Sequence, residues 1–296
     1  MPRTIEHRAP KLTVEQAHDQ LIAHVESLTA SAEWLKYLGC AAKFHSYSPN
    51  NIFLILIQRP EATRVAGFQT WKALGRSVKK GSSGIAILCP CVRNRRVENE
   101  QTGDITTRQL LLGFRIGYVF DVADTEGAEL SDVTHMVQHP EGKAPAGMFE
   151  ALATQVEAQG FSVRVHPSLD NSLGMAWGRT DYTNRTVTVR STADPAGCCK
   201  TLAHELAHVM LHEHSTDGCR GTVEIEAESV AYIVSAHFGL DTSAYSAGYL
   251  ASWSGGSREQ ILATASRVLT CAKAIVTTLQ SAHDVVWPAS ALSDHA

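Results

Sequence analysis

The sequence predicts an α+β protein of two domains, because its hydrophobic periodicity changes twice along the chain. Apolar residues recur at helical spacing between residues 13 and 40. From 65 to 119 they form short alternating or apolar runs separated by glycine-rich turns, which is typical of a small sheet. Helical segments with short strand-like runs between them return after residue 147. A length of 296 residues leaves room for two hydrophobic cores.

The first domain is predicted to span residues 1–125 as a small α+β unit. One or two amphipathic helices are expected over 13–40, and an apolar helix over 52–58 after a polar loop. The runs 85–92 and 107–120 are expected to form a hairpin, since both are rich in residues that favour strands.

The second domain is predicted to span residues 147–296, after a linker at 126–146 that contains acidic residues and prolines. Its expected elements are a helix at 148–159, strands at 161–166 and 186–190, a helix covering 201–211, a second helix opening at 224, and a C-terminal helix at 258–279. A strand, a turn, an edge strand and then a helix is the layout of a zincin lobe, where the edge strand can receive an extended peptide.

The pattern His204-Glu205-Leu206-Ala207-His208 lies in the middle of this second domain. On a helix, HExxH places two imidazoles one turn apart on the same face, with a carboxylate beside them. Asp194 and Pro195 supply a start signal for that helix. His204 and His208 are therefore candidate metal ligands, and Glu205 is the candidate general base of a hydrolase.

A catalytic zinc site needs a third protein ligand, and the segment 224–228 offers three acids. Glu224 and Glu228 are four residues apart and share one helix face. We predict Glu224 as the ligand and Glu228 as the acceptor of a ligand histidine's free N–H, with the reverse assignment left open. Glu226 points elsewhere and is interpreted as a solvated residue, whereas His212 is interpreted as buried or outside the ligand set.

The net charge of −4 conceals an asymmetry between the two halves. Residues 1–128 carry 16 Lys and Arg against 12 Asp and Glu, a net charge of +4, while residues 129–296 carry 10 against 18, or −8. Between 59 and 96, nine basic residues are accompanied by Glu61 alone among the acids. This local excess indicates a polyanion as partner of the first domain.

Seven cysteines without framework spacing indicate reduced thiols. The first eleven residues lack an apolar signal region, and no run reaches 18 consecutive apolar residues. We therefore expect a cytoplasmic protein that does not interact with a membrane.

Several separated motifs resemble one known family. Phe44-His-Ser-Tyr-Ser-Pro-Asn-Asn51, the stretch 62–68, Trp71-Lys-Ala-Leu-Gly-Arg76 and the turn 78–85 look like the N-terminal single-stranded-DNA-binding domain of ArdC-type antirestriction proteins. HELAH, the later ExxxE and the aromatic segment 249–253 are similar to the zincin-like metallopeptidase domain that follows it in that family. Val209-Met-Leu-His212 is closer to ImmA/IrrE-type metallopeptidases, which cleave regulatory proteins.

The resemblance implies a DNA-associated metalloprotein with a zinc-dependent peptidase-type site, in which Mn²⁺ or another divalent ion is an alternative to Zn²⁺. It implies Tyr249 as the oxyanion donor, with Tyr245 as the alternative. Two other functions stay open: DNA coating by a protein whose metal lobe is silent, and an ImmA/IrrE-like protease that cleaves a repressor. The peptide substrate is not defined. The residues assigned to contacts with single-stranded DNA are Tyr47, Asn51, Arg64, Lys72, Arg76, Lys79 and Lys80.

Overall fold

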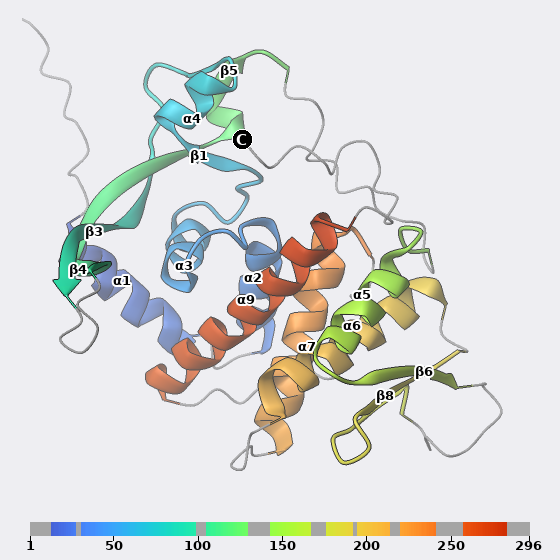
Figure 1. The fold of residues 1–296 in the computed structure, drawn as a ribbon. Helices are drawn as coiled ribbons and strands as arrows, with labels where there is room; N and C mark the ends of the chain where they lie inside the picture. The colour runs from blue at the N-terminus through green and yellow to red at the C-terminus, as the bar shows by residue number, and fades with distance from the viewer. Residues whose placement is uncertain are drawn as a thin grey trace, which may run out of the picture. The chain divides into compact units, whose positions relative to one another are not determined.

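The structure is a computed structural model, shown in Figure 1. It describes residues 13–27, 31–98, 105–129, 143–166, 176–191, 194–213, 220–240 and 257–282. Helices and small sheets alternate along the chain, so the predicted α+β class is confirmed. The chain divides into two compact units, of which unit 1 comprises Met1–His24 with Phe53–Gly127, and unit 2 comprises Val25–Ile52 with Ala128–Ala296.

This division is not a single cut along the sequence, because α2 belongs to unit 2 although it precedes most of unit 1. The predicted linker starts at residue 126, where the chain is still part of a strand, and residues 130–142 lie outside the described residues. The domain boundaries at 125 and 146 stay predictions.

Unit 1 is built around a long antiparallel hairpin. Its elements are α1 (Val14–Ser27), α3 (Pro49–Gln58), β1 (Val65–Gly67), α4 (Phe68–Ala73), β2 (Arg76–Val78), β3 (Ile85–Glu98), β4 (Ile105–Asp121), the 3-10 turn η1 (Val122–Asp124) and β5 (Thr125–Gly127), with α1 and α3 crossing the division between the units. The predicted hairpin is β3–β4. Both strands extend further towards the connecting turn than the sequence predicted. β1 pairs with β4, and β2 pairs separately with β5.

Side chains join the helices of unit 1 to the hairpin through backbone groups. The Gln58 amide donates to the carbonyl of Ala86 and accepts from its N–H, both at 2.9 Å. Trp71 is fully buried and its indole donates to the Phe120 carbonyl at 2.9 Å. The core of this unit therefore uses the apolar helix α3 and the alternating strand β3, as their hydrophobicity predicts.

Unit 2 contains the helices that position the candidate site. They are α2 (Ser31–Lys43), α5 (Met148–Ala158), α6 (Pro195–His212), α7 (Arg220–His237) and α9 (Arg258–Gln280). α7 packs against α2, α6 and α9, and α5 packs against α6 and α9. The indole of Trp34 on α2 donates to Ser229 on α7 at 3.0 Å, inside the core. Figure 1 shows α6 and α7 next to each other, with α9 beside α7.

The sheet of unit 2 has the order β6–β8–β7, formed by β6 (Ser162–His166), β7 (Gly178–Asp181) and β8 (Thr186–Arg190). β6 pairs with β8 in parallel and β7 pairs with β8 antiparallel. The strand directly before the HExxH helix is thus central, and the expectation that it is an edge strand was wrong. The parallel partner β6 occupies its other side, so β7 is the edge strand that packs against α6.

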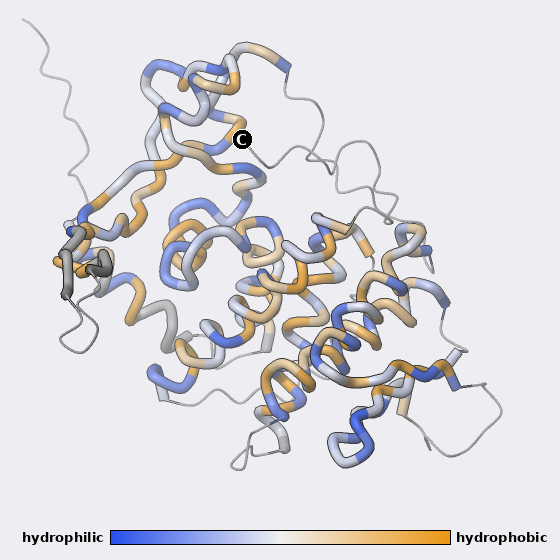
Figure 2. Tube along the Cα trace, viewed as in Figure 1, coloured by the Kyte–Doolittle hydropathy of each residue, from blue (hydrophilic) through white to orange (hydrophobic). Residues whose placement is uncertain are grey.

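Helix α9 is long and apolar enough to cross a membrane by length and composition alone, with a mean hydropathy of 1.3 over its best window. Half of that window is buried inside the protein. Figure 2 shows hydrophobic and hydrophilic segments in turn along this helix, as expected for a core helix with one exposed face. Its N-terminus has a full capping box between Ser257 and Gln260.

Candidate metal centre

Helix α6 presents the HExxH residues because its opposite face is buried. The Asp194 side chain accepts the N–H of Gly197 at 2.7 Å, and Pro195 occupies the first turn, so the predicted start signal is used. Leu202 and Leu206 are fully buried. This packing directs His204 and His208 to the side that faces α7.

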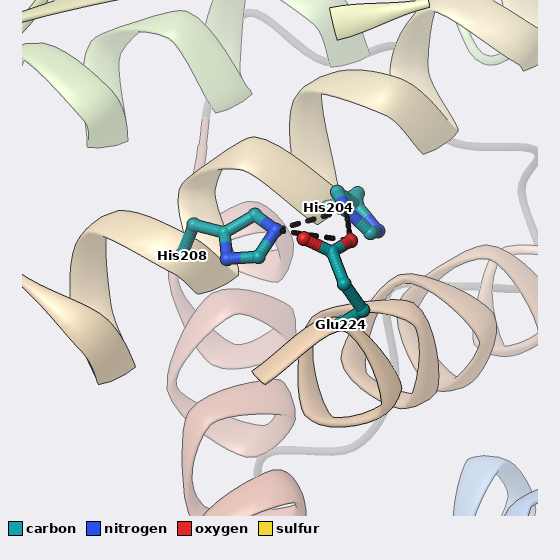
Figure 3. Close-up of side chains that lie close together, drawn as sticks. All are labelled: His204, His208 and Glu224. Atoms are coloured by element: carbon teal, nitrogen blue, oxygen red, sulfur yellow. Dashed lines mark hydrogen bonds and ion pairs between the residues drawn. The ribbon is translucent and has the colours of Figure 1, made fainter. Parts of the chain in front are cut away.

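The structure brings together His204, His208 and Glu224 (Figure 3). The two Nε2 atoms lie 3.0 Å apart, and Oε2 of Glu224 lies 3.5 Å from Nε2 of His204 and 3.7 Å from Nε2 of His208. Within the described part of the chain, these residues form a group of three whose potential ligand atoms all lie within 4.8 Å of one another. Two imidazole nitrogens and a carboxylate are donors that suit a divalent cation.

The electrostatics of this group are those of a cation site. Burial lowers the pKa of His204, but hydrogen bonds to Glu224 and Glu228 outweigh it and raise this pKa to about 9. Hydrogen bonds from His204 and His208 hold the pKa of Glu224 well below its usual range. Without a metal, the site therefore favours a proton between its donors, and a bound metal would have to displace that proton.

Glu228 faces the other nitrogen of His204. Its Oε2 lies 3.2 Å from Nδ1 of that histidine, and its Oε1 lies 2.6 Å from Nζ of Lys200, which is itself buried. The assignment of Glu228 outside the ligand set is compatible with this placement. Lys200, one turn before His204 on α6, was not singled out from the sequence, because its partner is 28 residues away.

Glu226 is buried, with 3% of its surface exposed, so its interpretation as a solvated residue was wrong. His212 and Arg267 both interact with its carboxylate. His212 also lies next to His208, in agreement with its interpretation as a buried residue outside the ligand set. Helix periodicity placed Glu226 away from Glu224, but it could not show that α9 covers that second face.

Glu205 is buried beside the edge strand β7. Its Oε2 accepts a hydrogen bond from the Thr180 hydroxyl at 2.6 Å. A Cβ added to Gly178 would lie 2.5 Å from Oε1 of Glu205 and 2.7 Å from Cγ2 of Thr201, so a larger residue here would displace these side chains. Thr180 and Gly178 thus define the position of the candidate base. Both residues belong to a strand that precedes HExxH, but the sequence alone could not show that this strand packs against α6.

A cavity of about 780 Å³ opens over these residues. Trp177, Thr180 and Tyr182 line it from the sheet, and His204, Glu205, His208 and Glu224 line it from the helices. The Tyr182 hydroxyl donates to the His208 carbonyl at 3.1 Å, and burial followed by the charge of Glu205 raises its pKa to about 12. Tyr249 and Tyr245, the predicted oxyanion donors, lie outside the described residues.

The residues predicted to contact DNA are distributed over both units. Arg64, Lys72, Arg76, Lys79 and Lys80 belong to unit 1, whereas Tyr47 and Asn51 belong to unit 2. Lys72, Lys79 and Lys80 are exposed, Arg64 and Tyr47 are half-buried, and Asn51 is buried. The ring of Tyr47 packs edge-on against Phe44.

Local partners reduce the basic excess that the sequence indicates. Arg76 donates to the hydroxyl and the carbonyl of Thr125, which joins β2 to β5. Arg59 forms ion pairs with Asp124 and Glu61. Asp124 follows 65 residues later in the chain, so counting charges between 59 and 96 could not reveal it.

Apolar side chains are also exposed on the same unit. Phe68 on α4 is 53% exposed, and a series on the hairpin is exposed as well. The members of that series are Val92, Leu110, Leu111, Leu112, Phe114 and Tyr118. The sequence predicted strands over this region, but it could not show which side chains of β3 and β4 are left exposed.

Two family models match the chain. Residues 12–120 match the N-terminal domain of the anti-restriction factor ArdC, and residues 158–267 match the IrrE N-terminal-like domain of the M78 peptidase type. Each match covers less than half of the chain, so each one shows what a single part of the chain is similar to. The predicted resemblance is therefore confirmed for both halves, and the second match covers the HExxH helix and Glu224.

Individual relatives of the chain are distant. The uncharacterized protein pXO2-81 of Bacillus anthracis is 24% identical over 289 residues, which cover 84% of this chain and 48% of that protein, so the chain spans about half the length of this relative. The metal-free crystal structure of the antirestriction ArdC protein from plasmid R388 has a TM-score of 0.48 at 20% identity, covering 79% of this chain and 86% of that chain. Its Mn(II)-bound structure has a TM-score of 0.49 at 18% identity, covering 95% and 98%.

Proposed function

We propose that this protein joins a metal-dependent peptidase site to a unit that binds single-stranded DNA without sequence preference. The observation that carries the peptidase part is the convergence of His204, His208 and Glu224 in a cavity that also contains the buried carboxylate of Glu205. The biological setting that we propose is antirestriction, or another function of a mobile element or of a DNA-stress response, in the cytoplasm.

The proposed metal is Zn²⁺, with Mn²⁺ as the alternative. Three protein donors and an open cavity correspond to a catalytic site, which keeps one position for water or substrate. Glu224 is half exposed towards the cavity, while both histidines are held from behind by other side chains. A bound metal of this kind lowers the pKa of a water and polarises a carbonyl oxygen.

Glu205 is the proposed general base. Its carboxylate lies in the same cavity as the three donors, and the Thr180 hydroxyl holds one of its oxygens at 2.6 Å. The other oxygen is left to accept a proton from water and to pass it to the leaving nitrogen. Fixing a carboxylate in this way reduces the reorganisation needed during reaction.

The proposed substrate is an extended peptide segment. β7 is an edge strand that lines the cavity, so its free backbone groups can pair with a peptide laid along it. Trp177, with 47% of its surface exposed, provides an apolar contact at the start of this strand. Such a segment would cross the cavity next to Glu205.

The exposed lysines of unit 1 support the proposal of DNA binding. Lys72, Lys79 and Lys80 lie on α4 and next to the turn at Gly81, where they can contact phosphates. Phe68, exposed on α4 beside Lys72, provides a ring on which a base can stack. The combination of cations and an exposed ring binds single strands with little sequence preference.

A second candidate function follows from the match of residues 158–267 to the IrrE N-terminal-like domain. In that case the site cleaves a regulatory protein, and unit 1 brings the enzyme to a DNA-bound partner. A third candidate keeps DNA binding and has a catalytically silent metal lobe.

One pair of measurements tests these functions. The Glu205→Gln variant keeps the metal donors and removes the base, so we expect full metal content by mass spectrometry and complete loss of the biological effect. An unchanged effect would contradict the peptidase and favour the silent lobe. For the wild type, binding to a naked oligonucleotide should weaken steeply with salt, whereas no binding at low salt would favour docking to a protein.

A further inference from the structure

We propose that His212, Glu226 and Arg267 are positioning residues that fix the tautomer of His208 and thereby determine the metal affinity of the site. The inference rests on the metal binding proposed above. It adds a buried series of hydrogen bonds that starts on α9, passes through α7 and the end of α6, and reaches one of the two histidine ligands.

The series is continuous in the structure. Nδ1 of His208 lies 3.1 Å from Nδ1 of His212, and Nε2 of His212 lies 3.1 Å from Oε2 of Glu226. The other oxygen of Glu226 accepts from Nε of Arg267 at 2.9 Å, from a second nitrogen of the same guanidinium, and from the Thr264 hydroxyl at 3.3 Å. His212 and Glu226 are 8% and 3% exposed, so water does not replace these partners.

The chemistry of Glu226 determines the direction of every hydrogen bond in the series. A carboxylate only accepts, so the proton of His212 that faces it must be on Nε2. A neutral His212 then has its lone pair on Nδ1, where it accepts from Nδ1–H of His208. With its proton on Nδ1, His208 has a lone pair on Nε2, the atom that lies beside Nε2 of His204 and Glu224.

Both histidine ligands thus carry their proton on Nδ1, but different groups fix it there. Nδ1 of His204 faces the carboxylate of Glu228 directly, which fixes its proton without an intermediate. Nδ1 of His208 faces another imidazole, which can donate or accept. Glu226 is therefore required to make His212 an acceptor, and Arg267 keeps the carboxylate in the orientation that does so.

Glu226→Gln is the sharpest perturbation, because it preserves shape and reverses the hydrogen-bond direction. Arg267 donates twice to the oxygen at the Oε1 position, so the carbonyl oxygen of the new side chain belongs there. Its NH₂ group then faces Nε2 of His212 and donates to it. His212 must carry its proton on Nδ1, which drives the proton of His208 to Nε2 and blocks the ligand atom.

The experiment reads the tautomers and the metal affinity separately, on the full chain. Long-range ¹H–¹⁵N spectra of the imidazoles should show the Nε2–H tautomer of His212 in the wild type and the Nδ1–H tautomer in Glu226→Gln. The Kd for Zn²⁺, measured by competition with a chelator, should rise about 10- to 100-fold in the variant. Cys271→Ala, a buried change on the same face of α9 outside the series, should shift this Kd less than twofold.

Each outcome is decisive for one claim. An Nδ1–H tautomer of His212 in the wild type would overturn the inference even if Glu226→Gln did not fold. An unchanged Kd for Zn²⁺ in a folded Glu226→Gln variant would overturn it as well. Failure of the wild type to bind Zn²⁺ or Mn²⁺ would instead refute the proposed function, and the wild-type spectrum would still test the direction of the series.

Discussion

Replacing Lys200 by Met should destabilise unit 2 strongly, because it leaves the carboxylate of Glu228 buried without its cation. The two charged atoms are 2.6 Å apart, and their side chains are 10% and 3% exposed. Breaking a buried ion pair from one side costs about 3–5 kcal/mol. Glu228 keeps His204 as a partner at 3.2 Å, so we expect a loss at the lower end, about 3 kcal/mol.

Urea denaturation of the metal-free protein, followed by circular dichroism, measures this loss. The matched control is Lys36→Met, which removes an ion pair with Glu33 of the same length, 2.6 Å, from a side chain that is 62% exposed. Exposed pairs contribute less than about 1 kcal/mol, so this change should be small. Adding Glu228→Gln to Lys200→Met should restore part of the stability, because the unpaired charge is removed. A Lys200→Met variant as stable as the control would refute the reasoning.

Three further changes test single contacts. Gly178→Ala should displace Glu205 and abolish peptide cleavage while the metal content stays unchanged; retained cleavage would show that the carboxylate can move without consequence. Lys80→Gln should reduce the slope of log K against log salt for single-stranded DNA by about 0.7, and an unchanged slope would exclude a phosphate contact at this position. Asp194→Ala should lower the free energy of unfolding by about 1 kcal/mol in urea, and no loss would mean that the first turn of α6 does not depend on its cap.

Local signals in the sequence predicted the elements well. The helix at 148–159, the cap at Asp194 and the hairpin between β3 and β4 each depend on neighbouring residues, and the structure contains all of them. Strand order failed because it depends on a parallel pairing between β6 and β8, which no turn connects. The periodicity of a strand is the same at the centre and at the edge of such a sheet.

The part of the site that depends on helix geometry was predictable from the sequence. HExxH places His204 and His208 on one face of α6 from spacing alone, and Glu224 is brought to them by the packing of α7 on α6. The burial of Glu226 was not predictable, because Arg267 is 41 residues away on a helix whose position the sequence does not specify. A charged residue on an amphipathic helix is normally solvated. Glu226 is buried instead, because α9 packs over its side of α7.

We predict Glu224 and not Glu228 as the third ligand, because the two carboxylates face different atoms of the histidines. Oε2 of Glu224 faces the Nε2 atoms of both histidines, whereas Glu228 faces Nδ1 of His204 and Lys200. Glu224→Ala should therefore remove a donor and reduce affinity for Zn²⁺ more than 100-fold. Glu228→Gln should reduce it by about 10- to 100-fold, because it perturbs a ligand without removing one.

Competition with a chelator, under the same conditions for both variants, gives the two Kd values for Zn²⁺. A greater loss for Glu228→Gln than for Glu224→Ala would reverse the assignment and place Glu228 on the metal. That result would also require Lys200 to leave Glu228, since an ammonium group 2.6 Å from one carboxylate oxygen competes with a cation for the same charge. Lys200 therefore gives a physical reason to expect Glu224 as the ligand.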